Sequence, residues 1–458
     1  MAETISDPQV RATAHPTYGE AVAAWTRIGL LSFGGPAGQI ALMHKVVVDE
    51  KRWLDERQFL SALNFCMLLP GPEAMQLATY VGWRLHGIAG GLAAGLLFVI
   101  PGALVVLALS AFYAAFGNVP LVAALFVGVK AAVLAIVIQA LLKVAGRALK
   151  GTGDWLIAAA AFVAIFLFKL PFPLIVLTAA LIGYLRGMAG HQPSTGHGGG
   201  NAHADAGPSL VLPAPRSTIM GTLATIAVWI AIWVVPLAAI SLALGPAHVL
   251  SQASVFFSKL AVVTFGGAYA VLAYMAQEAV DKYGWLKPGE MLDGLGLAET
   301  TPGPLILVTE FVGFQAGHRW DGGGNWPMAL ATAGVTLWAT FAPCFLWIFA
   351  GAPYVERLNA IPKLKAALAA VTAAVVGVIL NLSVWFAINV LFRSVSRVQW
   401  GPLDLGVPQL ASLDAVAGAL AALAAVLLFW ANRGVLTVLA VCAAFALAGH
   451  AIRIGVGA

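Results

Sequence analysis

The sequence predicts an all-α polytopic membrane protein built from two inverted homologous halves. Three observations predict this fold class. First, the 458 residues are 60% hydrophobic and 10% charged, whereas an ordinary soluble domain carries about 25% charged residues. Second, apolar runs of about 20 residues, each long enough to cross a hydrocarbon core of about 30 Å, recur along almost the whole chain. Third, a set of short motifs appears twice in the same order.

The apolar runs predict about thirteen spans or re-entrant helices. Lipid cannot satisfy loose backbone groups, so each run is predicted to be helical. The runs cover residues 20–47, 57–83, 88–116, 119–148, 154–170, 172–187, 218–244, 250–280, 290–316, 326–352, 362–392, 411–430 and 434–453. The polar start of the chain lacks the features of a signal peptide, so residues 1–19 are expected to be a cytoplasmic tail.

One segment divides the chain into halves. It is rich in Gly, His, Ala, Ser and Pro, and is expected to be a flexible linker. Its histidines His191, His197 and His203 are six residues apart, a period that neither a helix nor a strand presents on one face, so a spacer is favoured over a metal site. The predicted domains are the tail at 1–19, a first repeat at 20–189, the linker at 190–217, an extra linking span at 218–249, and a second repeat at 250–458.

Cysteines and net charge indicate no redox, metal or nucleic-acid chemistry. Cys66, Cys344 and Cys442 are isolated in apolar surroundings without metal-ligand spacing, so core packing is expected. The formal net charge is +5, but most Lys and Arg flank the predicted spans, and membrane topology explains them better than nucleic-acid binding. No cofactor is expected, and the bilayer is the expected environment.

The internal repeat is the most informative pattern. Phe33-Gly34-Gly35, Trp53-Leu54 and Pro70-Gly71-Pro72 recur as Phe265-Gly266-Gly267, Trp285-Leu286 and Pro302-Gly303-Pro304, each at an offset of 232 residues. Ala131-Ala132-Val133 recurs at an offset of 242, as Ala373-Ala374-Val375. About 120 residues of each half are therefore duplicated. If each copy has six spans and one extra span joins them, the second copy enters the membrane inverted, as in many secondary transporters.

The distribution of Lys and Arg supports inversion only in part. Lys143 and Arg147 follow the fourth span, while Lys363 and Lys365 precede its counterpart, as inversion and the positive-inside rule predict. Four further cations fall on the side expected to be poor in positive charge, namely Lys45, Lys51, Arg52 and Arg57. Either the first pair of spans is re-entrant or the rule is locally overridden.

Two motifs in each half are predicted to break helices inside the membrane. A glycine pair frees the backbone, and two prolines remove two hydrogen-bond donors. Each break leaves unpaired amides at a helix N-terminus, where an anion would satisfy both the amides and the helix dipole. Four breaks paired across the repeats therefore predict a binding site near the midplane. The alternative is that the glycines only permit close helix packing and the prolines only kink.

Three cations are candidate anion ligands. Arg27 precedes Gly34 by seven residues and Lys259 precedes Gly266 by the same interval, so each lies two turns from its break on the same helix face. Lys130 lies in the middle of the fourth span, far from either end. Charges inside the membrane usually face a cavity or a partner. The alternative for Arg27 and Lys259 is that they snorkel to the interface.

Acidic and polar side chains complete the predicted site. Glu73 follows Pro72 in the first turn of a helix, where it either binds a proton or caps the N-terminus. The predicted proton-coupling residues are Glu73, Glu299 and Glu310. The predicted substrate-binding residues are Arg27, Ser32, Gly34, Gly35, Gln39, Asn64, Gly71, Gln76, Lys130, Lys259, Gly266, Gly267, Thr301 and Gly303. Scattered polar side chains are also common between packed membrane helices, and that reading stays open.

The ordered motifs resemble those of the chromate ion transporter family. Phe33-Gly34-Gly35-Pro36, the segment from Asp49 to Trp53, and Pro70-Gly71-Pro72 follow the family's order, and the second half repeats them as in its long, two-domain members. The resemblance implies export of chromate across a bacterial inner membrane. The second copy has Ala268 after its glycine pair and Leu305 in place of Glu73, so the main site is expected in the first half.

The alternatives differ in substrate or in class. Sulfate presents nearly the same acceptors as chromate, and the sequence does not separate the two oxyanions. A membrane enzyme is disfavoured because there is no paired-His, Cys-cluster or Rossmann pattern to carry electrons. A channel would differ from a carrier by its non-saturable flux. Whether copies of the chain form homo-oligomers is left open.

Overall fold

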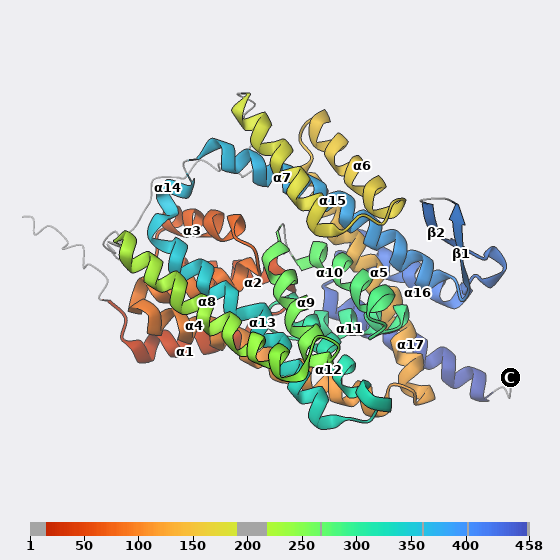
Figure 1. The fold of residues 1–458 in the computed structure, drawn as a ribbon. Coiled ribbons are helices and arrows are strands. Elements are labelled where there is room, and N and C mark those ends of the chain that lie inside the picture. The colour runs from red at the N-terminus through yellow and green to blue at the C-terminus, as the bar shows by residue number, and fades with distance from the viewer. Residues whose placement is uncertain (1–14, 190–217, 266–267, 360, 401–402, 456–458) are drawn as a thin grey trace, which may run out of the picture.

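The computed structural model describes residues 15–189, 218–265, 268–359, 361–400 and 403–455, and nearly all of this part is helical (Figure 1). The first half contains α1 (Tyr18–Leu31), α2 (Gly35–His44), the π-helix η1 (Lys45–Glu50), α3 (Glu56–Leu68), α4 (Glu73–Phe116), α5 (Pro120–Ala148), α6 (Thr152–Phe166) and α7 (Phe172–Met188). The predicted linker and its three histidines lie outside the described residues.

The second half repeats this order after one extra helix. It contains α8 (Ile219–Leu244), α9 (Val249–Val263), α10 (Ala268–Ala276), the π-helix η2 (Gln277–Lys282), α11 (Pro288–Thr300), η3 (Leu305–Leu307), α12 (Val308–His318), η4 (Trp320–Gly322), α13 (Trp326–Gly351), η5 (Ala352–Tyr354) and α14 (Val355–Asn359). The chain ends with α15 (Pro362–Leu391), β1 (Val395–Trp400), β2 (Leu403–Pro408), η6 (Leu410–Ser412), α16 (Ala415–Ala425), η7 (Val426–Trp430) and α17 (Val435–Gly455).

Six helices among the described residues are long and apolar enough to cross a membrane. They are α4, α5, α8, α15, α17 and the segment that α13 begins, and four shorter apolar helices accompany them. The extra helix α8 is the least buried of the six and packs on α9 and α13. Its many exposed apolar side chains, such as Leu242 at 87% exposure, suit contact with lipid acyl chains. The prediction of a helical, multi-pass membrane protein is therefore confirmed at this level.

Four predicted spans are interrupted at the predicted motifs. The first span divides into α1 and α2 around Gly34, and the second divides into α3 and the start of α4 around Pro70-Gly71-Pro72. In the second half, α9 ends before the glycine pair, and α11 ends just before Pro302. Glycine and proline thus end the helices where the sequence predicts. A further distortion lies at His86 and Gly87, where the backbone of α4 leaves helical geometry.

The two halves exchange their final helices. Helices α6 and α7 of the first half pack along α15 of the second, while α16 and α17 of the second half pack along α5 of the first (Figure 1). Helices α5 and α15 are counterparts in the repeat. The last two helices of each half therefore cover the equivalent helix of the other half. The core is continuous across both halves, and the three cysteines are buried in it, as expected.

A β-hairpin corrects the purely helical prediction. Strands β1 and β2 follow α15 and pair in antiparallel fashion, with Val395 opposite Pro408. The segment alternates apolar and polar residues on either side of Gly401-Pro402, a pattern typical of a hairpin. It lies between two long apolar runs, whose composition hid this short signal.

Candidate functional site

The four helix breaks meet in two reciprocal pairs. The amide of Gly71, in the Pro-Gly-Pro break of the first half, donates a hydrogen bond of 2.8 Å to the carbonyl of Thr264. The amide of Gly303, its counterpart in the second half, donates one of 2.9 Å to the carbonyl of Ser32. Each Pro-Gly-Pro break is thus hydrogen-bonded to the residue that directly follows α1 or α9 in the other half. We call these four segments the helix-break junction.

Backbone conformation explains why glycines occupy the junction. Gly34 and Gly35 have φ of 86° and 72°, and Gly71 and Gly303 have φ of 123° and 85°. These values lie in the region that side chains with a Cβ rarely adopt. Gly266 and Gly267, the predicted counterparts of Gly34 and Gly35, lie outside the described residues.

Buried carboxamides line the junction. Gln39 is 1% exposed, and its Nε2 donates to the carbonyl of Gly303 at 2.5 Å. Gln76 is fully buried, and its Nε2 donates to the carbonyl of Pro70 at 2.7 Å. The Oε1 atoms of both side chains are buried and have no hydrogen-bond partner in the part of the chain that the structure describes. A buried oxygen without a hydrogen bond destabilises the fold. Each of these two carboxamide oxygens can therefore still accept a hydrogen bond from a ligand.

The junction also uses some of the polar groups that the sequence suggested for an anion. The amides of Gly71 and Gly303 are occupied by carbonyls, and the hydroxyls of Ser32 and Thr301 donate to carbonyls within their own segments. The N-termini of α2 and α4 have no side-chain cap, so their first amides remain the available donors. Asn64 lies on the exposed face of α3, away from these contacts.

The predicted acids occupy different environments. Glu73 begins α4 directly after Pro72 and is half-buried. Glu299 is 4% exposed and accepts a hydrogen bond of 2.6 Å from the hydroxyl of Tyr269. Glu310 is 1% exposed, and its Oε2 has no hydrogen-bond partner among the described residues. The structure does not bring the three carboxylates into one cluster.

The predicted cations also separate. Arg27 is about half exposed and forms an ion pair of 2.6 Å with Glu50, at the end of η1. Lys259, its counterpart on α9, is exposed. Lys130 is the partly buried one of the three, and its Nζ lies 3.5 Å from Oδ1 of Asp293 on α11. The ion pair between Arg27 and Glu50 means that an anion at Arg27 would compete with a carboxylate already in place.

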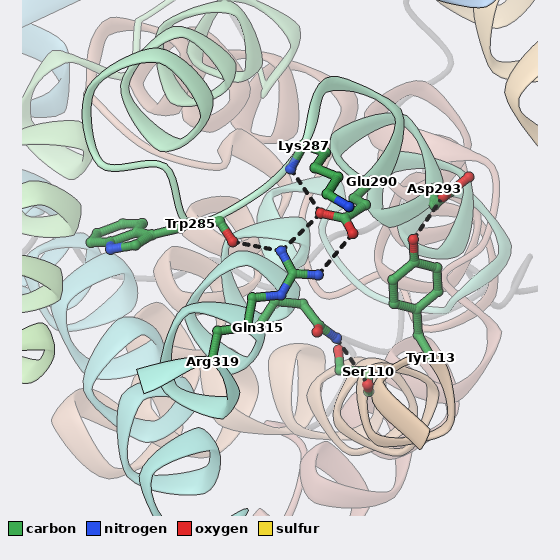
Figure 2. A network of polar contacts seen from close by, with 8 residues as sticks. All are labelled: Ser110, Tyr113, Trp285, Lys287, Glu290, Asp293, Gln315 and Arg319. Atoms are coloured by element: carbon green, nitrogen blue, oxygen red, sulfur yellow. Dashed lines mark hydrogen bonds and ion pairs between the residues drawn. The ribbon is translucent and has the colours of Figure 1, made fainter. Parts of the chain in front are cut away.

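Sequence reasoning missed Asp293 and Tyr113. Asp293 is 3% exposed and accepts a hydrogen bond of 2.8 Å from the hydroxyl of Tyr113 on α4 (Figure 2). One signal was available, because an acid inside an apolar segment is expensive and usually has a function or a partner. The partners themselves have no local signal, since they lie on other helices far away in the sequence.

A second network fixes the helix that carries Asp293. Arg319 binds both oxygens of Glu290 at 2.8 Å and also donates to the carbonyl of Trp285 at 2.8 Å. On the neighbouring turn of α12, Gln315 donates to the carbonyl of Ser110 on α4 at 3.1 Å (Figure 2). These contacts tie α11 to α12, and α12 to α4. These contacts therefore fix α11, which carries Asp293, relative to α4, which carries Tyr113.

The fold and junction define a multi-pass helical membrane protein with paired, broken helices, an arrangement typical of transporters. A family model for chromate transporters matches residues 19–184 and 251–449. The chain therefore belongs to the chromate transporter family, in its long form with two regions. This confirms the family that the motifs suggested.

Curated relatives carry transport names. The chain is 34% identical to a chromate transport protein of Pseudomonas aeruginosa, over 79% of each chain. It is 30% identical to a chromate transport protein of Cupriavidus metallidurans, over 80% of this chain and 82% of the relative. A probable chromate transport protein of Synechococcus elongatus is 29% identical over 80% and 84%. No solved structure matches the chain significantly.

Proposed function

We propose that this protein is a secondary transporter that exports chromate across the bacterial inner membrane. The observation that carries the proposal is the reciprocal junction of four helix breaks at the centre of a chain from the chromate transporter family. Transporters commonly bind substrate where broken helices of two repeats meet, because half-helix N-termini supply amides and a positive dipole end. The uncapped first turns of α2 and α4 supply these features here.

The proposed orientation of the halves is inverted. The repeated motifs, the extra helix α8 between the copies and the reciprocal exchange of the last two helices all support this plan. Rocking of one repeat against the other would then expose the junction to each side of the membrane in turn. The two hydrogen bonds between the halves lie where such motion has to make and break contacts.

The membrane potential is the proposed driving force. A dianion that leaves a cell across an inside-negative potential of about 100 mV gains about 4.6 kcal/mol, at about 2.3 kcal/mol per charge. That energy supports a concentration gradient of more than about a thousandfold. Uptake of a proton together with the anion would instead favour import. We therefore leave proton transfer by Glu73 out of the export cycle.

The test is radiolabelled chromate flux into inverted membrane vesicles with the potential clamped by valinomycin and potassium. Export predicts saturable uptake that grows as the vesicle lumen is made positive and persists when the pH gradient is collapsed. Unlabelled sulfate serves as competitor and should inhibit only at higher concentration than chromate. Uptake no greater than in vesicles lacking the protein would refute transport, and uptake that requires an imposed pH gradient would refute the proposed driving force.

A further inference from the structure

A cavity of about 610 Å³ lies beside the second half. Its walls come from α5, from α10 and η2, from the start of α11, and from α15, and residues of the β-hairpin reach its edge. The volume is within the range of about 300–1,000 Å³ that small-molecule sites usually have. Three carboxamide side chains line it, at Gln277, Asn381 and Asn389, and the Nδ2 of Asn389 donates to the carbonyl of Trp385. Of the substrate-binding residues predicted from the sequence, Lys130 lines this cavity.

Charged side chains of both signs line the cavity. Three cations line the cavity, namely Lys130, Lys169 and Arg393, together with the acids Asp281 and Asp414. Asp414 holds Arg393 at 2.9 Å, so that pair is neutral overall. Lys130 is the cation on a long membrane helix, and its side chain is 27% exposed. A cation there lowers the cost of bringing an anion out of water.

Lys130, which lines the cavity, forms an ion pair with Asp293, whose two carboxylate oxygens have different partners. Oδ2 of Asp293 accepts the hydrogen bond from Tyr113, whereas Oδ1 lies 3.5 Å from Nζ of Lys130 and accepts no hydrogen bond from the described residues. Asp293 is therefore fixed, while the ammonium of Lys130 ends a flexible chain of four methylenes. At Gly289 a Cβ would lie 3.4 Å from Nζ of Lys130, so this residue leaves room around the ammonium.

This pair also breaks the symmetry of the repeat. At the offset of 242 that holds for the fourth span, Lys130 corresponds to Thr372. At the offset of 232, Asp293 corresponds to Ser61. The charge pair thus occurs once in the duplicated sequence.

We propose that Lys130 is the cation that binds a tetrahedral divalent oxyanion in this cavity, and that Asp293 is its internal counter-ion, which the anion displaces and which later displaces the anion. The inference rests on the proposed function and adds a second anion site, separate from the helix-break junction, because no junction residue lines the cavity. In the empty carrier Asp293 neutralises Lys130. When the oxyanion enters, the ammonium moves to it, and Asp293 keeps its hydrogen bond from Tyr113. Return of Lys130 to Asp293 then favours release.

The test measures the KM and maximal rate of chromate flux in vesicles, and equilibrium binding of chromate to the purified protein. Lys130→Gln should weaken binding and raise KM by about tenfold or more, the effect of losing a charge-assisted hydrogen bond. Asp293→Asn should lower KM and also lower the maximal rate, because the anion loses its competitor. These opposite shifts in KM are the signature of competition, and a structural role would move both variants in the same direction.

The matched control is the ion pair between Arg186 and Asp154, which has the same N–O distance of 3.5 Å and lies away from the cavity. Arg186→Gln should leave KM unchanged. Lys130→Arg keeps the charge and should retain binding, so it separates charge from folding. If Lys130→Gln does not reach the membrane, the direction of the KM shift in Asp293→Asn decides.

Two results would overturn the inference: an unchanged KM in Lys130→Gln at normal expression, or a raised KM in both variants. The proposed function fails separately. If the parent binds chromate but does not transport it, loss of binding in Lys130→Gln upholds the site while the transport proposal falls. A parent that neither binds nor transports chromate refutes both.

Discussion

At the scale of single residues, Gly71 shows how the junction depends on backbone freedom. Its φ of 123° is strained for any residue with a Cβ, and a Cβ there would lie 2.7 Å from Nε2 of Gln76 and 3.0 Å from Sγ of Cys344. We expect Gly71→Ala to cost about 1–3 kcal/mol in the junction and to reduce chromate flux severely. Gly146 on α5 has open space around its Cα, so Gly146→Ala is the control and should transport normally. Equal flux in the two variants would contradict this role of Gly71.

Arg27 and Glu50 give a second prediction at this scale. Hydrogen bonds from Arg27 are the main cause that holds the pKa of Glu50 below its usual value. A carboxyl with a lowered pKa keeps its ion pair at neutral and mildly acidic pH and loses it only as the pH falls through that lowered pKa. Mild acidification should therefore leave the pair intact.

Substitution of each partner then tests Arg27 as an anion ligand. If Arg27 meets the oxyanion, as the sequence predicts, Glu50→Gln frees the guanidinium and should lower the KM for chromate at pH 7. Arg27→Gln should raise that KM. The KM of each variant is measured from chromate flux over a range of chromate concentrations. An unchanged KM in both variants would show that Arg27 does not bind the oxyanion and that its ion pair with Glu50 is only a surface contact.

At the scale of helices, α4 approaches the helix-break junction closely. Gly102 on α4 lies against Pro302, where an added Cβ would overlap the carbonyl oxygen of that residue. We expect Gly102→Ala to push α4 away from the break, at a cost of about 1–3 kcal/mol for overpacking. The readouts are chromate flux and thermal stability in detergent. A variant with parental flux and stability would show that the junction tolerates displacement of α4.

The helical elements were largely predictable, and their partners were not. Hydropathy predicts the spans because lipid demands helices about 20 residues long, and Gly and Pro predict the breaks because they act locally on the backbone. The contact of Lys130 with Asp293 joins two helices from different halves, and no local pattern encodes it. The same limit applies to Arg27, because no local pattern predicts its partner Glu50. Arg27 and Gly34 also do not share one helix face as predicted, since α1 ends at Leu31.

At the scale of the whole molecule, the exchange of terminal helices predicts that the halves need each other. Helix α5 is covered by α16 and α17, and α15 by α6 and α7. If the chain is divided within residues 190–217, the two fragments expressed together should assemble and restore chromate resistance. Each fragment expressed alone should be degraded, because it exposes faces that the other half normally covers. Stable membrane insertion and flux by either fragment alone would refute this dependence.

The exchanged helices also set an order of events during synthesis. The ribosome releases α5 early, yet the helices that cover it are the last ones made. Until α16 and α17 are synthesised, one side of α5 must therefore face lipid or a chaperone. The fold is complete only after translation has ended. A nonsense mutation near the end of the gene would then remove the cover of the first half as well as the tail of the second.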